Sequence, residues 1–231
     1  MSRVAIVRSA GVKEGIWHAL DMLDDLPSLF QGKYVAIKPN DTWASSNDTT
    51  ACTQADSVEA VIQYVKKFNP SRIVVSGGAG AAETDEVFAL LGIDKVIQSE
   101  KVEFFDHNRP PFKSVPLSYG PQREVRINPH ILEYETLISL AQHKVHYEAT
   151  VTLTMKNIAM SFPAADYYGH PRGIQKRPNQ FYLDMHGFIA GMCRRFPIDL
   201  GIIVGHPAMT GRGPIGGLAF ESELTIAGKD C

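Results

Sequence analysis

Apolar residues in the first half of the chain alternate between the spacing of strands and the spacing of helices. Short apolar runs predict strands over residues 3–8, 34–38 and 72–76. Apolar positions three and four apart predict helices over residues 13–26, from about 57 to 68, and over 84–91. Asp56 and Glu59 have the spacing of a capping box, and Gly92 is expected to end the third helix.

Strands that alternate with short helices are typical of parallel βαβ units. The sequence therefore predicts an α/β fold: a three-layer, mostly parallel, Rossmann-like sheet with helices on both faces. We expect residues 1–231 to form a single α/β domain. Ligands of such sheets bind at the carboxyl ends of the strands, so residues that follow strands are the first candidates for a site.

The second half is less regular. Apolar runs predict strands over 136–140, 151–155 and 200–204 and a helix over 181–196. Residues 107–122, which carry four prolines, are expected to form an excursion, and residues 161–179 a long ordered loop. Glycines and prolines predict a further loop over 205–217.

The strand expected at 151–155 raises a question about its polar face. Val151, Leu153 and Met155 would pack against the core, because they alternate with threonines. The other face could simply meet water. We predict instead that it delivers Lys156 and Asn157 to the rim of a pocket.

Composition limits the partners and the cofactors. The chain is 44% hydrophobic and 21% charged, which fits a protein with a sizeable core. A net charge of -2 argues against nucleic-acid binding, and no apolar run approaches the roughly 20 residues that span a bilayer. Its three cysteines are far apart, which excludes a CxxC zinc knuckle or an iron–sulfur cluster held by this chain and fits a cytoplasmic protein.

Lysine and asparagine recur at strand ends. Lys38 is the last residue of the second predicted strand and Asn40 follows it, and Pro39 is expected to leave the lysine at the rim of the sheet. Lys144 and His146 are two residues apart, so both can project to one side of an extended chain. An Asx turn at Asn40 is the alternative to a ligand-binding role.

Two glycine-rich segments could bind an anion. Gly78 and Gly80 lie between a predicted strand and helix, where backbone amides can hold a carboxylate or phosphate, although Glu83 replaces the third glycine of a dinucleotide motif. Arg212 lies among glycines in residues 205–217 and could bind the same groups. A tight turn without ligand and a mobile surface loop are the respective alternatives.

Histidines gather in segments that follow predicted strands. We expect at least one of His146, His170 and His206 to be a site residue. The same three are the candidates for a divalent metal, but no HxH or HExxH spacing supports a metal site. The sequence therefore leaves the cofactor unknown.

Together these motifs resemble the family numbered 362 among the domains of unknown function. The resemblance rests on Ile37-Lys-Pro-Asn40, Lys144-Val-His146, the run Val-Thr-Leu-Thr-Met-Lys-Asn157, His170, the stretch 208–216 and the ending 226–230. It covers almost the whole chain. More loosely, the organisation is similar to the N-terminal domain of nickel-dependent lactate racemases, which is an analogy of fold.

The chain departs from the family in three ways. Many members look as if they carry ferredoxin-like cysteine segments, which this chain does not match. An acidic dipeptide often precedes the position of Ala208, where this chain has Gly205-His-Pro207. Members usually continue beyond the motif that ends at Asp230, which leaves open a short variant or a truncated chain.

Our first hypothesis is an enzyme that acts on a small carboxylate- or phosphate-bearing molecule. Lys38, Lys156 and Arg212 would hold charge, with Asn40 and Asn157 orienting the ligand. His146 would move protons near neutral pH, or a lysine of lowered pKa would be the base or a Schiff-base nucleophile. The alternatives are a non-catalytic module for a metal or anionic cofactor, and part of a redox enzyme whose cluster domain lies elsewhere. A homo-oligomer and a redox partner stay open.

Overall fold

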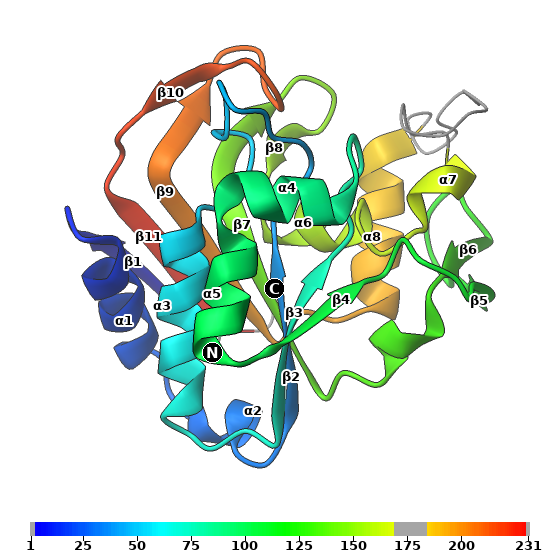
Figure 1. The fold of residues 1–231 in the computed structure, drawn as a ribbon. Helices are drawn as coiled ribbons and strands as arrows, with labels where there is room; N and C mark the ends of the chain where they lie inside the picture. Colours follow the sequence, from blue (N-terminus) through cyan, green and yellow to red (C-terminus); the bar gives the residue numbers. More distant parts are fainter. Residues whose placement is uncertain (1–2, 169–183, 230–231) are drawn as a thin grey trace.

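A mixed sheet runs through the centre of the protein (Figure 1). The computed structural model describes residues 3–168 and 184–229, and in these residues the sheet has nine strands. The strands are β1 (Val4–Arg8), β2 (Tyr34–Pro39), β3 (Arg72–Gly77), β4 (Glu103–Asp106), β7 (Thr136–His146), β8 (Thr150–Thr152), β9 (Leu200–Thr210), β10 (Leu218–Phe220) and β11 (Leu224–Lys229). Seven follow the order β1-β11-β9-β7-β2-β3-β4, β10 pairs with β9, and β8 pairs with β7.

The middle of the sheet is parallel, as the alternation of strands and helices predicted. β9, β7, β2, β3 and β4 pair in parallel, whereas β11 is antiparallel to both of its neighbours, β9 and β1. The parallel strands therefore end at one edge of the sheet, where β2, β3 and β7 present the residues that follow them. This confirms the α/β fold with a mostly parallel sheet.

Helices cover both faces of the sheet (Figure 1). Alternate residues of β2 enter different cores: Val35 and Ile37 face one, Ala36 the other. The first core lies under α1 (Val12–Asp21), α3 (Ala55–Lys66), α5 (Ile93–Glu100) and the short α2 (Pro27–Phe30), and the second under α6 (Thr154–Ala159) and α8 (Met185–Arg195). The remaining helices are α4 (Thr84–Leu91), α7 (Ala165–Tyr168) and the 3-10 turn η1 (Pro129–Leu132).

The strand predicted over residues 151–155 is present only as far as Thr152. β8 ends at Thr152 and α6 begins at Thr154. Thr152 and Thr154 are buried, while Val151 and Met155 are each 40% exposed, the reverse of the expected faces. The cause is the short hairpin in which β8 folds back on β7, because it turns the threonines inward and leaves too few paired residues for a longer strand.

Three predicted loops contain regular structure. β9 continues through His206 to Thr210, where a loop from residue 205 was predicted, because β10 and β11 both pair with it. The proline-rich segment 107–122 contains β5 (Lys113–Pro116), which pairs with β6 (Glu124–Ile127) and packs Val115 and Val125 into the second core. α7 interrupts the loop predicted at 161–179, and the part of that loop from residue 169 lies outside the described residues.

Helix ends were predicted with mixed success. Gly92 ends α4 in the left-handed conformation, as expected. The capping box at Asp56 is absent: its carboxylate accepts the N–H of the adjacent Ser57, and α3 begins after Gln54. α1 ends at Asp21, although Leu26 is still buried in the same core, which is why the apolar spacing predicted a longer helix.

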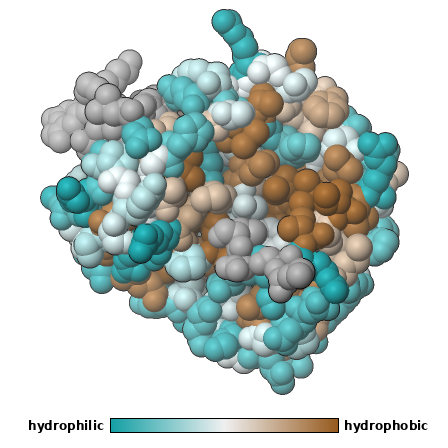
Figure 2. Space-filling model, turned by 180° about the vertical axis from the view of Figure 1, so that it is seen from behind, coloured by the Kyte–Doolittle hydropathy of each residue, from teal (hydrophilic) through white to brown (hydrophobic). Residues whose placement is uncertain are grey.

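The edge strand β1 leaves apolar side chains in the open. Val4 and Ile6 are 62% and 64% exposed, while Ala5 and Val7 between them are buried. From behind, the surface shows a broad apolar area (Figure 2).

None of the helices over residues 3–168 and 184–229 combines the length and the apolar character that crossing a bilayer requires.

Candidate functional site at the carboxyl ends of the parallel strands

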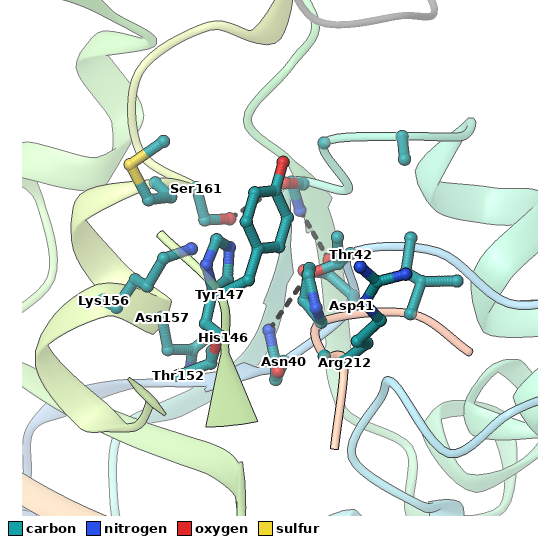
Figure 3. A pocket seen from close by; sticks show the side chains of 17 residues that line it. Asn40, Asp41, Thr42, His146, Tyr147, Thr152, Lys156, Asn157, Ser161 and Arg212 are labelled. Carbon is teal, nitrogen blue, oxygen red and sulfur yellow. Dashed lines mark hydrogen bonds between the residues drawn. The ribbon is translucent and has the colours of Figure 1, made fainter. Parts of the chain in front are cut away.

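A pocket of about 380 Å³ opens where β2, β3 and β7 end. That volume suits a small metabolite. Residues predicted to form a site line it from five segments: Asn40, Gly78, Gly80, His146, Lys156, Asn157 and Arg212. Thr42, Tyr147, Thr152 and Ser161, none of them predicted, also line it (Figure 3).

Lys38 lies beneath the pocket and does not line it. Its side chain is fully buried, and its Nζ lies 2.6 Å from Asp41 Oδ1. The other carboxylate oxygen of Asp41 accepts the N–H of Gly78 at 2.8 Å. The expectation that Pro39 leaves Lys38 at the rim is therefore wrong, because the chain turns back over the lysine and places a counter-ion on it three residues later.

Lys144 is a second fully buried lysine. Its Nζ donates to the carbonyl oxygen of Ala51 at 2.5 Å. Burial lowers the pKa of Lys144 to about 8. Like Lys38, it does not line the pocket, so its effect on a ligand would be electrostatic rather than a direct contact.

His146 is held as a neutral ring with one fixed donor. Its Nδ1 accepts the N–H groups of Glu148 and Ala149 at 3.1 and 3.3 Å, so the ring proton lies on Nε2. Burial, together with the charges of Lys156 and Lys144, lowers the pKa of His146 to about 3. A histidine with this pKa does not fit the predicted role of moving protons near neutral pH. Its Nε2–H can instead donate a hydrogen bond.

Lys156 reaches the pocket from the first turn of α6. Figure 3 shows its side chain extending toward the His146 ring. It forms no hydrogen bond or ion pair with any residue of 3–168 or 184–229 that the structure describes. Burial, and then the charge of Lys144, lowers the pKa of Lys156 to about 7. An amine with such a pKa is largely uncharged just above neutral pH, so it can act as a base or as a nucleophile.

The two asparagines tie the pocket wall to the sheet. Asn157 Nδ2 donates to the carbonyl oxygen of Lys38 at 2.9 Å and to Ser139 Oγ at 3.1 Å. Asn40 Nδ2 donates to Thr42 Oγ1 at 3.3 Å. Both N–H donors of the Asn157 side-chain amide bond to strands of the sheet. This residue therefore fixes the position of α6, and with it the position of Lys156.

The glycine-rich segment after β3 offers fewer free amides than predicted. The N–H of Gly78 is bound to Asp41, that of Ala79 to Thr84 Oγ1, and that of Ala81 to the carbonyl oxygen of Thr42. These three amides therefore do not form the anion cradle that the sequence suggested. Glycine is needed at position 78 for close packing, since a Cβ there would lie 1.7 Å from His107 Nε2.

A buried hydrogen-bond chain that the sequence did not predict supports this wall. His107 Nδ1 lies 3.1 Å from Ser76 Oγ, and Nε2 lies 3.0 Å from Ser161 Oγ. The hydroxyl of Ser161 donates to the carbonyl oxygen of Gly78, so its oxygen accepts the hydrogen bond from His107 Nε2–H. His107 Nδ1 is then the acceptor of the Ser76 hydroxyl, and the Ser76 oxygen accepts from the Tyr134 hydroxyl. Burial lowers the pKa of His107 well below its usual value. The only sequence signal was the place of His107 just after a strand.

Arg212 and two predicted histidines differ in how they relate to the pocket. Arg212 lines the mouth of the pocket and is exposed. His206 does not line it, and its Nδ1 lies 3.5 Å from Glu221 Oε2. His170 lies outside the described residues. Within residues 3–168 and 184–229, no three His, Cys, Asp or Glu side chains are grouped so that they could hold a metal ion.

Two of the buried histidines, His107 and His146, predict that the free energy of unfolding falls in mild acid. Both His107 and His146 have folded-state pKa values below the unfolded value of about 6.5, so the unfolded state binds more protons below that pH. From pH 6.5 to 5 each is expected to cost up to about 1.4 kcal/mol per pH unit. The loss of stability per pH unit is measured by urea unfolding of wild type and His107→Gln from pH 6.5 to 5. Equal pH slopes for the two proteins would contradict the account of His107.

Comparison with known proteins agrees with the resemblance seen in the motifs. The sequence model of a domain of unknown function (DUF362) matches residues 35–231. No curated protein sequence matches the chain. The lactate racemase apoprotein of Thermoanaerobacterium thermosaccharolyticum is similar in structure, with a TM-score of 0.56 and 16% sequence identity over 87% of this chain and 50% of that protein. A structural-genomics protein of Thermotoga maritima has a TM-score of 0.49 and 14% identity, over 84% of this chain and 49% of its own.

The likeness to the lactate racemase apoprotein is one of fold alone. The chain spans half the length of the lactate racemase apoprotein, and 16% identity does not carry an activity from one protein to the other. The family match is different in kind, because it covers most of the sequence, from β2 to the last residue. The chain therefore belongs to the DUF362 family.

Proposed function

We propose that the pocket binds a small molecule bearing a carboxylate or phosphate, and that Lys156 acts on this molecule as an uncharged amine. The observation that carries the proposal is the position of the Lys156 amine, which faces the pocket without an ion-pair partner among the described residues. A surface lysine is normally charged and solvated, whereas the lowered pKa of Lys156 leaves much of its amine uncharged near neutral pH.

The charges around the pocket favour an anionic ligand. Asp41 neutralises the buried charge of Lys38. The buried Lys144 donates instead to a carbonyl oxygen, and the exposed Arg212 lies at the pocket mouth, across from Lys156 (Figure 3). A ligand oxyanion would meet the guanidinium of Arg212, which suits carboxylates and phosphates because it offers parallel N–H donors.

A non-catalytic module for a metal or anionic cofactor is the competing function. The described residues supply no group of metal ligands, and a carrier would not need a lysine of lowered pKa. Elemental analysis of protein purified without an affinity tag separates the two. Stoichiometric metal that is lost on His146→Ala would favour the module.

The proposal is tested by a thermal-shift screen of small carboxylates and phosphates. A ligand present at about 100 times its dissociation constant should stabilise the native state by about 2.7 kcal/mol, which raises the melting temperature by several degrees. We expect Lys156→Met and Arg212→Gln to lose most of this shift. Lys113→Met is the matched control, since Lys113 is an exposed lysine of β5 that does not line the pocket.

The screen can contradict the proposal in two ways. If Lys156→Met keeps the full ligand-induced shift, Lys156 is not part of the site. If neither Lys156→Met nor Arg212→Gln differs from wild type in its response to any hit, the ligand binds elsewhere and the pocket has another role.

A further inference from the structure

We propose that the ligand also carries an aldehyde or ketone, and that Lys156 bonds covalently to its carbonyl carbon as an imine. This inference rests on the proposed function and names the substrate class of the same site: a carbonyl compound with an oxyanionic group. It is carried by the arrangement of Lys156, His146 and Arg212 around the pocket (Figure 3).

The first support is the direction of Lys156. The side chain leaves α6 toward the pocket, and the hydrogen bonds of the adjacent Asn157 to the sheet hold the helix in place. A nucleophilic amine needs a free lone pair, and no hydrogen bond or ion pair to a residue of 3–168 or 184–229 occupies the amine.

The second support is the single donor of His146. Because Nδ1 accepts two backbone N–H groups, only Nε2–H remains for a ligand. A neutral imidazole with a lowered pKa is suited to hydrogen-bonding a carbonyl oxygen, a role that a histidine has in triosephosphate isomerase. The charge of Lys156 acts on the His146 ring, so the two groups lie near each other, and Figure 3 shows the Lys156 side chain directed toward the ring. We therefore infer that one carbonyl group meets the donor with its oxygen and the amine with its carbon.

The third support is selectivity among lysines. With a pKa of about 7, about half of Lys156 is uncharged at pH 7, against about one part in 2,500 for an ordinary lysine of pKa 10.4. The neutral amine is therefore enriched about a thousandfold at this position. Lys144 also has a lowered pKa, but it is fully buried and does not line the pocket.

The step balances without an oxidant or a reductant. The Nζ lone pair attacks the carbonyl carbon, and one proton passes from the nitrogen to the carbonyl oxygen, which gives a neutral carbinolamine. The carbinolamine hydroxyl then takes up one proton from solvent, the C–O bond breaks as water leaves, and the nitrogen lone pair forms the C=N bond of a protonated imine on Lys156. The carboxylate or phosphate of the ligand would remain near Arg212, across the pocket.

Borohydride trapping of the full chain at pH 7 tests the inference. Pyruvate, dihydroxyacetone phosphate and acetaldehyde serve as probes with a carboxylate, a phosphate and no anion. Intact mass spectrometry and peptide mapping locate the reduced adduct. With at least one anionic probe we expect a single adduct on Lys156, which is absent in Lys156→Arg and unchanged in Lys113→Arg. Arg212→Gln should reduce trapping of the anionic probe at least tenfold but leave trapping of acetaldehyde unchanged.

The outcomes separate this inference from the proposed function. Adducts spread over surface lysines, or equal labelling of Lys156→Arg and wild type, would overturn the imine. If an anionic probe stabilises the protein to heat but no adduct is trapped, the pocket still binds oxyanions and only the imine is wrong. If acetaldehyde labels Lys156 as fast as the anionic probes, the amine is reactive but the requirement for an oxyanion fails.

Discussion

Replacing Asp41 with alanine is expected to lower the free energy of unfolding by about 3–5 kcal/mol. The Asp41 carboxylate is the counter-ion of Lys38, with the two side chains 3% and 0% exposed and their atoms 2.6 Å apart. Removing it would leave the buried lysine with the carbonyl oxygen of Pro39 as an acceptor but without a counter-ion for its charge. It would also leave the N–H of Gly78 without its acceptor. Urea unfolding of the variant measures the loss.

Two controls make this prediction specific to burial. Asp85 forms an ion pair with Arg109 at 3.1 Å, but both side chains are more than half exposed, so Asp85→Ala is expected to cost less than about 1 kcal/mol. The double variant Lys38→Met, Asp41→Asn removes both charges and keeps an oxygen near Gly78. It should be more stable than Asp41→Ala. If it is not, the buried charge of Lys38 is not what makes Asp41 important.

The role of the Lys38–Asp41 pair could not have been read from the sequence. Lys38 lies near the end of β2 and Asp41 follows that strand, so both are at the edge of the sheet where the parallel strands end. Whether a side chain turns toward a pocket or beneath it depends on the fold of the segment that follows. Here the segment after β2 packs Ala44 and Cys52 into a small core of their own, and so closes over Lys38. Local spacing does not encode that closure.

The same limit explains the strand that was predicted at 151–155. Alternation of apolar and polar residues over five positions was read as a packed strand, but the hairpin with β7 turned Thr152 inward. Lys156 and Asn157 nevertheless line the pocket, because α6 begins at the edge that a strand would have reached. The sequence therefore predicted the location of these two residues while giving the wrong element for them.

The parallel strands were predictable for a physical reason. β2, β3 and β7 are buried on both faces, so they appear in the sequence as continuous apolar runs between glycine- and proline-rich turns. β11 and β4 lack that signal. β11 is recognisable only by its pairing with β1 and β9, which are distant in the sequence, and β4 is an edge strand with three of its four residues outside the core.

Lys156→Met is expected to stabilise the protein in the absence of ligand while it abolishes function. The pKa of Lys156 is about 7 in the folded chain and about 10.4 when unfolded, so the unfolded state binds more protons between these values. Stability due to this group therefore rises with pH from 7 to about 10, and the penalty is full below pH 7. At pH 6 the variant is expected to gain about 1–3 kcal/mol over wild type.

The pH dependence distinguishes this effect from ordinary repacking. Lys144, Glu148 and His146 surround the amine and are present in both proteins, so the difference between the two proteins reports Lys156 itself. The advantage of Lys156→Met should shrink as the pH rises from 7 toward 10, whereas a gain from methionine packing would not change. Lys113→Met should show neither the gain nor the trend. A destabilised Lys156→Met would mean that the lysine supports the fold. A stabilised variant that no longer binds ligand would mean that Lys156 lowers the stability of the protein but is needed for ligand binding.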